Sequence, residues 1–282
     1  MAVIRIAIAI IFFLTSFATQ ARPRSPEPEP SVWLYNQTQD HLVAEKNAHQ
    51  IRPFASITKL MTAMIVIDQD WNWERRLQLS KLAGSRLPTG KYTRGELLRA
   101  LLINSNNAAA ETFAADYPGG RSAFLQAMNQ RAWNLGMYST QFQDPSGLSA
   151  GNVSNAEDLG TMIRAAGEYS IIRDISIQSH VAVETRSRKR TRIMELNNTN
   201  GRALGMIDNV RVGKTGFTNP AGFCMGLQVE QQGEVYLVVV LGAKNSTKRL
   251  DLVKNLLYNH TVESTNAKDS DSNRRSRRLQ TK

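Results

Sequence analysis

The clearest hydrophobic pattern in the chain is helical and covers Ala55 to Ile67. Apolar residues recur there at spacings of three and four, which predicts one face of a buried helix. They are Ile57, Leu60, Met61, Met64 and Ile65. Lys59 interrupts this apolar stretch, three residues after Ser56. Because a fully buried lysine is rare unless it is paired or used, Lys59 is a candidate functional residue.

Helical spacing continues through the middle of the chain. Thr93 and Glu96 form a capping-box pattern before "LLRALL", and Ser154 and Glu157 form a second one further on. A third helix is predicted for "SAFLQAMNQRAWNL", ending at Gly136. The segment between the first apolar helix and about residue 205 is therefore predicted to be largely helical.

Strand-like patterns lie at both ends of the folded region. "SVWLYN" and "HLVAEKN" flank the turn-like "QTQD", which predicts a hairpin, and "NVRVGKTGFT", "GFCMGLQVE" and "EVYLVVVLGA" predict three sequential antiparallel strands. A last helix is predicted for "STKRLDLVKNLLYNH". The pattern indicates a mixed α/β fold of the α+β type, in which helices are inserted between the first and last strands.

Four regions differ in composition. Residues 1–21 carry Arg5 and then an apolar run that ends in small residues, which predicts a secretory signal peptide and no transmembrane anchor after its cleavage. Residues 22–31, "RPRSPEPEPS", are predicted to be a stiff linker. Residues 32–261 are expected to form one domain, and the polar residues 262–282 a disordered basic tail.

The formal net charge is +11 and the sequence pI is about 10.0. For an exported protein this charge favours an anionic lipid or wall polymer over nucleic acid. The positive charge concentrates in "RSRKRTR" at 186–192 and "RRSRR" at 274–278, predicted to be a solvated loop and a solvated tail. The tail is also a candidate for loose contact with an anionic envelope surface.

The residues suited to catalysis do not include a recognisable histidine motif. The histidines are His41, His49, His180 and His260. The only cysteine, Cys224, lies in an apolar strand-like run and is expected to be a small core residue. No paired-histidine spacing predicts a metal site.

Ser56 and Lys59 offer another way to activate a serine nucleophile, because residues three apart share a helical face. Desolvation would favour a neutral lysine amine that can accept the serine proton.

Two further motifs occur in a specific order after this pair. Ser105-Asn106-Asn107 lies between two predicted helices, and Lys214-Thr215-Gly216 lies in a predicted strand. Singly, the first could be a helix cap and the second an exposed strand. Together with Ser-x-x-Lys they form the ordered set found in penicillin-binding proteins and class A β-lactamases.

The chain resembles low-molecular-mass penicillin-binding proteins of the D-alanyl-D-alanine carboxypeptidase (peptidase S11) family over roughly residues 32–260. Longer stretches are similar to its D-alanyl-D-alanine endopeptidase branch: "RPFASITKLMTAMIVID", "YPGG", "DPSGLSAGNVSNAEDL" and "GKTGFTNPAGFC". The resemblance implies a β-lactamase/transpeptidase-like fold, an antiparallel sheet flanked by helices. It also implies a periplasmic serine peptidase, endopeptidase or carboxypeptidase, that acts on peptidoglycan stem peptides without a cofactor or metal.

The resemblance also implies roles for the motif residues. Ser56 would attack the peptide carbonyl, Lys59 would accept its proton, and Ser105 would relay a proton to the leaving amine. Asn107 would orient the substrate amide. Lys214 would keep the site electropositive.

The third motif and its neighbours would bind the substrate. Thr215 would bind a carboxylate, assisted by Arg249, and the strand that contains Gly216 would hold an extended peptide. The backbone N–H groups of Ser56 and Phe217 would form the oxyanion hole. β-Lactams would acylate Ser56 as covalent inhibitors.

The residues alone are also compatible with two other functions. A serine β-lactamase shares the three motifs, although Ser105-Asn106-Asn107 has asparagine where those enzymes have aspartate, and Glu157 is a poor substitute for their deacylating glutamate. A non-catalytic wall-binding protein would fit the positive charge and the basic tail.

Overall fold

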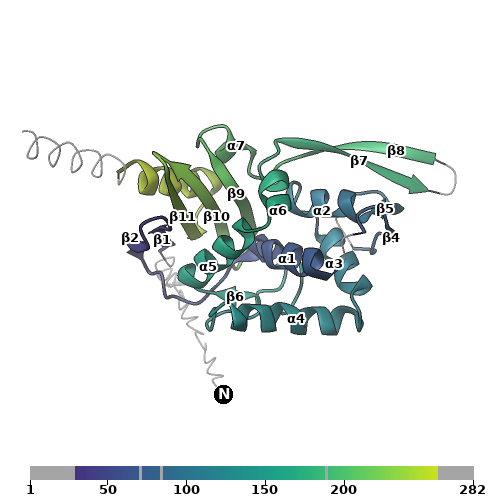
Figure 1. The fold of residues 1–282 in the computed structure, drawn as a ribbon, viewed down its shortest axis with the longest axis horizontal. Helices are drawn as coiled ribbons and strands as arrows, with labels where there is room; N and C mark the ends of the chain where they lie inside the picture. The colour runs from purple at the N-terminus through teal and green to yellow at the C-terminus, as the bar shows by residue number, and fades with distance from the viewer. Residues whose placement is uncertain (1–28, 70–71, 83–84, 188–189, 260–282) are drawn as a thin grey trace, which may run out of the picture.

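A computed structural model describes residues 29–69, 72–82, 85–187 and 190–259 (Figure 1). The predicted signal peptide, most of the linker and the basic tail lie outside the described residues. Within these residues no helix has both the length and the apolar composition needed to cross a membrane.

A five-stranded antiparallel sheet contains the first and last strands of the chain. Its order is β2-β1-β11-β10-β9, so the N-terminal hairpin joins the three C-terminal strands through the pairing of β1 with β11. The bounds are β1 Ser31–Asn36, β2 His41–Lys46, β9 Val210–Thr218, β10 Gly222–Gln231 and β11 Glu234–Ala243. The predicted hairpin and the three sequential antiparallel strands are both confirmed. β9 is an edge strand, which leaves one side of its backbone open to an extended ligand.

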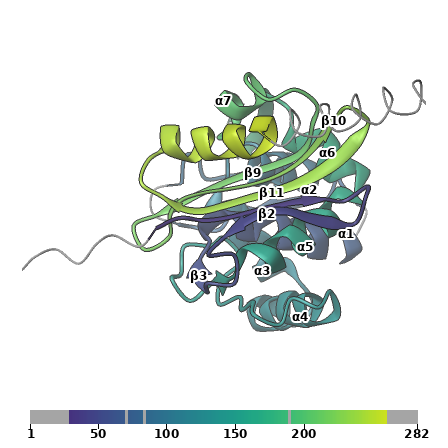
Figure 2. The same ribbon diagram turned by 90° about the vertical axis from the view of Figure 1, so that its left-hand side faces the viewer.

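Helices cover both faces of this sheet, as Figure 2 shows. On one face lie α1 (Lys59–Gln69) and α5 (Ala156–Gly167), and the helix formed by residues 246–259 covers the other together with α7 (Gly201–Leu204). Close packing on the first face depends on small residues, because a Cβ on Gly160 would come within 2.1 Å of the Trp33 ring. Separate apolar cores fill the two faces.

The inserted helices form a second region beside the sheet, with α1 passing through it (Figure 1). These helices are α2 (Arg94–Leu102), α3 (Asn107–Asp116), α4 (Gly120–Asn134) and α6 (Ser170–Ser176). The capping box of Thr93 and Glu96 is confirmed at the start of α2. The one predicted for Ser154 and Glu157 is wrong, because the cap of α5 is Asn155, whose side chain accepts from the Asp158 N–H.

Short strands complete the fold. β3 (Arg52–Pro53) pairs with β6 (Val153–Ser154), and a four-stranded sheet has the order β4-β5-β7-β8. Its strands are β4 Arg76–Gln78, β5 Lys91–Thr93, β7 His180–Ser187 and β8 Arg190–Asn197. The prediction of a solvated loop for 186–192 is therefore wrong. Most of that basic run belongs to the β7–β8 hairpin, which extends away from the body of the molecule (Figure 1).

Candidate active site

Ser56 lies in a turn of 3-10 helix, Ala55–Thr58, that leads directly into α1. Ser56 is partly accessible, whereas Ala55 and Ile57 on either side of it are buried. Ala55 has a φ of 49°, an uncommon conformation for a residue with a side chain and one that concentrates at functional sites. The backbone thus holds the Ser56 hydroxyl at the surface while its neighbours are anchored in the core.

Lys59 is fully buried and its amine contacts three oxygen acceptors. Nζ lies 2.8 Å from Ser56 Oγ, 2.7 Å from Asn107 Oδ1 and 2.5 Å from the Ser146 carbonyl oxygen. A charged ammonium would donate to all three. A neutral amine keeps two donors, enough for Asn107 and Ser146, and has a lone pair that can accept the proton of Ser56.

The surroundings of Lys59 favour its neutral form. Burial lowers the pKa of Lys59 well below its ordinary value, and the positive charge of Lys214 lowers it further, while the Asp144 carboxylate opposes this by raising it. Because desolvation penalises the charged form of a lysine, the apolar environment that made Lys59 anomalous in the sequence prepares it to act as a base.

Ser105 and Asn107 line a cleft at the start of α3, and Asn107 reaches Lys59 through its side-chain oxygen. Asn106, between them, caps this helix by accepting from the Ala109 N–H. Ser105 has a φ of 59°, a second uncommon backbone conformation in the site. The cleft has a volume of about 220 Å³ and is lined by Leu82, Ser85, Arg86, Asn104, Ser105, Asn106, Asn107 and Thr199. Among the described residues, the Ser105 hydroxyl makes no hydrogen bond to Ser56 or Lys59.

Lys214 and Gly216 on β9 face the 3-10 turn that contains Ser56 and the start of α1. A Cβ on Gly216 would lie 2.9 Å from the Ser56 nitrogen and from the Phe54 carbonyl oxygen, so only glycine allows the strand to approach this closely. Lys214 is buried and its Nζ donates to the Thr215 carbonyl oxygen at 3.0 Å. Burial and the nearby Arg249 guanidinium lower the pKa of Lys214 to about 7.

Thr215 points to the opposite face of β9, where its Oγ1 lies 2.8 Å from Thr199 Oγ1. Arg249, in the helix of residues 246–259, donates to the Cys224 carbonyl oxygen at 3.3 Å, and its guanidinium lies 5.8 Å from the Phe223 ring centroid. Phe223 pairs with Phe217 across the strands, and their ring centroids are 4.3 Å apart. Arg249 is thus beside the strand pair that carries the third motif.

Two residues of the site were missed in the sequence. Ser146 contributes only its carbonyl oxygen, and Thr199 contributes a hydroxyl that holds Thr215. The Asp144 carboxylate organises the loop before α5 by accepting from the backbone N–H groups of Ser146, Gly147 and Ser149. The stretch "DPSGLS" is rich in turn-forming residues, but nothing in it indicates a contact with Lys59.

The predicted core position of Cys224 is consistent with its full burial, which raises the pKa of the thiol to about 11. In the part of the chain that the structure describes, no group of three or more histidine, cysteine, aspartate or glutamate side chains could hold a metal ion.

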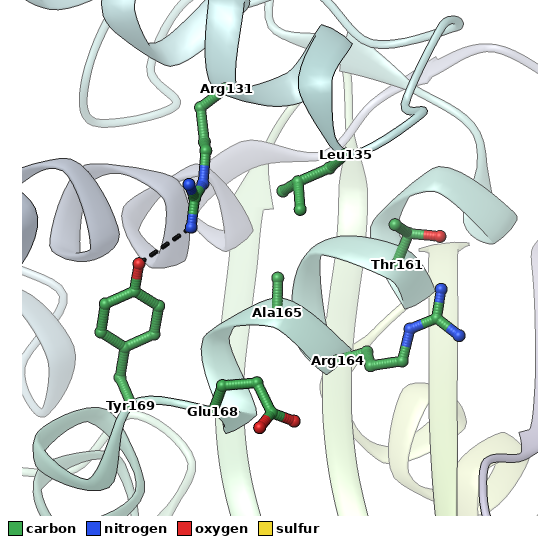
Figure 3. Close-up of a pocket in the computed structure, with 7 residues that line it drawn as sticks. All are labelled: Arg131, Leu135, Thr161, Arg164, Ala165, Glu168 and Tyr169. Carbon is green, nitrogen blue, oxygen red and sulfur yellow. Dashed lines mark hydrogen bonds between the residues drawn. The ribbon is translucent and has the colours of Figure 1, made fainter.

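A separate cavity of about 510 Å³ lies between α4 and α5 (Figure 3). Its lining residues are Arg131, Leu135, Thr161, Arg164, Ala165, Glu168 and Tyr169. Arg131 and Tyr169 point toward each other, with Nη2 donating to the phenolic oxygen at 3.0 Å. None of the three motifs lines this cavity.

Comparison with solved structures places this arrangement in a known fold. The DD-transpeptidase of Streptomyces K15 is 25% identical, with a TM-score of 0.75 over 80% of this chain and 94% of that one. Penicillin-binding protein D2 of Listeria monocytogenes, in its ampicillin-bound form, is 29% identical, with a TM-score of 0.72 over 80% and 94%. These similarities confirm the predicted β-lactamase/transpeptidase-like fold.

Proteins related in sequence indicate the same family as the fold does. The D-alanyl-D-alanine endopeptidase of Pseudomonas aeruginosa is 33% identical over 85% of this chain and 83% of its own length. That of Escherichia coli is 34% identical over 80% and 76%. The profile of the D-alanyl-D-alanine carboxypeptidase family matches residues 26–245. The resemblance predicted from the three motifs is therefore confirmed: the chain belongs to the D-alanyl-D-alanine carboxypeptidase family, peptidase S11.

Proposed function

We propose that this protein is a periplasmic serine peptidase that cleaves the amide between two D-configured residues in peptidoglycan stem peptides. The observation that carries the proposal is the hydrogen bond between a fully buried Lys59 amine and the Ser56 hydroxyl. A buried base within hydrogen-bonding distance of a serine is the arrangement that activates this nucleophile. Membership of the family and relatives that are D-alanyl-D-alanine endopeptidases support the substrate class.

Acylation begins with attack of Ser56 Oγ on the substrate carbonyl carbon while its proton moves to Lys59 Nζ. The resulting oxyanion is stabilised by the backbone N–H groups of Ser56 and Phe217, where one such donor is worth about 3–4 kcal/mol. Gly216 allows the two backbones to lie close enough for this. Asn107 orients Lys59 through its side-chain oxygen and the substrate amide through its N–H₂ group.

Collapse of the tetrahedral intermediate breaks the carbon–nitrogen bond. The proton held by Lys59 passes to the leaving amine through the Ser105 hydroxyl. Lys214 and Arg249 make this side of the cleft electropositive, and Thr215 donates to the carboxylate of the leaving residue. A water molecule then attacks the acyl-enzyme, the ester bond to Ser56 breaks, and the serine recovers its proton.

The extended substrate aligns with the open edge of β9 and uses its backbone hydrogen-bonding groups. A β-lactam would be attacked at its ring carbonyl in the same way, leaving a covalent adduct on Ser56. The ampicillin-bound form of the Listeria relative supports this expectation.

The test is digestion of a cross-linked muropeptide dimer and of a pentapeptide by the mature protein, with fluorescent penicillin labelling of Ser56. Cleavage of the dimer identifies an endopeptidase, and loss of the terminal D-alanine alone identifies a carboxypeptidase. If neither is cleaved and Ser56 is unlabelled, the proposal is wrong. Rapid turnover of penicillin would instead indicate a β-lactamase. If the Ser56→Ala variant binds the cell wall and acts in cells as the wild type does, the protein is non-catalytic.

A further inference from the structure

Two large aromatic side chains lie exposed at the C-terminal end of α4. Trp133 is 63% exposed and Tyr138 is 70% exposed, and their ring centroids are 4.8 Å apart with the rings inclined by 68°. An exposed apolar residue that stands alone needs no explanation, but two large rings packed on each other at the surface form a patch. Such patches mark interaction sites.

This aromatic pair borders one end of the cavity between α4 and α5. Leu135 lines the cavity and lies between the two aromatic residues in the chain. The segment after Tyr138 is tied to α5, because the Ser139 N–H donates to Asp158 Oδ2 at 2.8 Å. Asp158 is three residues before Thr161 on the same helical face, and Thr161 lines the cavity. The pair and the cavity therefore form one surface, the α4–α5 site.

The cavity of the α4–α5 site is elongated. In Figure 3 it runs along α5, with Thr161 at one end and Tyr169 at the other. Leu135 and Ala165 lie between them and give it an apolar floor. From Thr161 to Glu168 the chain rises about 10 Å along the helix axis. The volume of about 510 Å³ is typical of small-molecule sites, and the length suits a linear ligand.

Tyr169 offers its ring to a ligand in this cavity. Its hydroxyl is already used, because it donates to Asp68 Oδ1 at 2.8 Å and accepts from Arg131 Nη2 at 3.0 Å. Burial and the Asp68 carboxylate raise the pKa of Tyr169 to about 12, so the phenol stays protonated at neutral pH. The two partners hold the ring in a fixed position, where it can pack against the flat apolar face of a ligand.

The polar groups of the cavity supply both donors and acceptors. Among the described residues, the side chains of Thr161, Arg164 and Glu168 make no hydrogen bond, which leaves a hydroxyl, a guanidinium and a carboxylate for a ligand. The charges balance: the cations are Arg131 and Arg164. The anions are Glu168 and Asp68, the latter 3.9 Å from the Arg131 guanidinium. This balance favours a neutral ligand that both donates and accepts over a strongly anionic one.

We propose that the α4–α5 site binds a neutral glycan of N-acetylated amino sugars, the glycan chain of the cell wall. A sugar ring has an apolar C–H face for the rings of Tyr169 and Trp133, and hydroxyl and amide groups at its edge for Arg164 and Glu168. The choice of the wall glycan as the source of these sugars rests on the proposed function. Bound there, the glycan holds the enzyme on the polymer whose stem peptides enter the catalytic cleft.

The experiment titrates the mature protein with the tetramer of N-acetylglucosamine and measures binding by calorimetry. We expect saturable binding to the wild type, and Trp133→Ala and Tyr138→Ala each to raise the Kd about tenfold. Glu168→Gln, which keeps the shape of the side chain, should raise it severalfold. Tyr258→Ala removes another exposed aromatic ring, 46% exposed in the last helix, and as the matched control should leave the Kd unchanged. Because all these side chains are exposed, thermal unfolding should be unaltered.

Absence of tetramer binding would overturn the inference, as would a Kd that is the same in Trp133→Ala, Tyr138→Ala and the wild type. A free stem peptide that displaces the tetramer would also overturn it, since the site would then recognise peptide. Fluorescent penicillin labelling keeps the two proposals distinguishable, because each variant should be labelled as the wild type is. A labelled, active peptidase that does not bind the tetramer contradicts the glycan site alone, whereas a protein that binds the tetramer but is unlabelled and inactive contradicts the proposed function alone.

Discussion

Asn107 Oδ1 lies 2.7 Å from Lys59 Nζ, although 48 residues separate them in the chain. This contact joins the second motif to the first and places the start of α3 against the start of α1. With Ser56 and the Ser146 carbonyl it gives the buried amine one acceptor for each of the three N–H bonds of its charged form. Proton transfer from Ser56 therefore ends on an ammonium whose N–H groups are directed at protein oxygens.

Replacing Lys59 by Met keeps the length of the side chain and removes the base. We expect penicillin acylation of Ser56 to slow by about 100- to 10,000-fold, the typical contribution of a general base. Because Lys59 is uncharged or costly to charge in the buried site, the fold should persist, as checked by circular dichroism and thermal unfolding. Lys91→Met, at an exposed position on β5, is the control and should acylate normally. Normal acylation of Lys59→Met would exclude Lys59 as the base.

The pKa of Lys214 predicts an alkaline limb in the pH profile. At a pKa of about 7, Lys214 loses its charge as the pH rises through neutrality, so attraction of the substrate carboxylate weakens above pH 7. We expect kcat/KM, which reports ionisations of the free enzyme, to fall there. Lys214→Arg stays charged throughout this range and should remove the limb, even if its maximal rate is lower. A limb that persists unchanged in Lys214→Arg would assign it to another group.

The sequence predicted the parts of the site that depend on local spacing. Ser56 and Lys59 are three residues apart in one helical segment, so helical periodicity grouped them, and the order of the three motifs added Lys214 to Gly216, which lie in one strand. Contacts made by loops could not be predicted, because the Ser146 carbonyl reaches Lys59 from 87 residues away and any residue type can supply a carbonyl.

Two local predictions failed for physical reasons. Arg186 to Arg192 suggested a solvated loop because charge dominates the run, but a two-stranded hairpin with exposed faces accepts such residues, and β7 pairs with β8 there. At α5, Ser154 is drawn into pairing with β3 through Arg52. The neighbouring Asn155 is therefore the residue free to cap the helix.

Gly216→Ala tests the close approach of β9 to the nucleophile. The added Cβ would meet the Ser56 nitrogen and the Phe54 carbonyl oxygen at 2.9 Å, and both are backbone atoms that cannot rotate away. Overpacking of this kind costs about 1–3 kcal/mol, and we expect slower penicillin acylation because the strand is displaced from the oxyanion position. Gly205→Ala is the control, since its added Cβ would lie 3.5 Å from the Gly201 carbonyl oxygen, an ordinary contact distance. Unimpaired acylation in Gly216→Ala would show that the distance between these backbones is not critical.

Asp144→Asn tests the loop that supplies the Ser146 carbonyl. Burial alone would raise the pKa of Asp144, but hydrogen bonds from Ser149, Ser146 and Gly147 outweigh it and lower the pKa below its ordinary 3.8. A carboxylate whose pKa is lower in the folded state stabilises the fold at pH values above its unfolded-state pKa. This stabilisation is lost as the pH falls through its folded-state pKa. At pH 7 we expect the free energy of unfolding to fall by about 1–3 kcal/mol.

Because asparagine does not titrate, the stability gap between wild type and Asp144→Asn should narrow below about pH 4. Urea unfolding at pH 7 and pH 3 measures this gap, and Asp174→Asn, at an exposed position in α6, provides the control. Acylation should also slow in Asp144→Asn, since a displaced loop removes one acceptor of Lys59. If the stability gap has the same size at both pH values, the charge of Asp144 does not hold the loop. If acylation is normal in Asp144→Asn, the loop is not needed to orient Lys59.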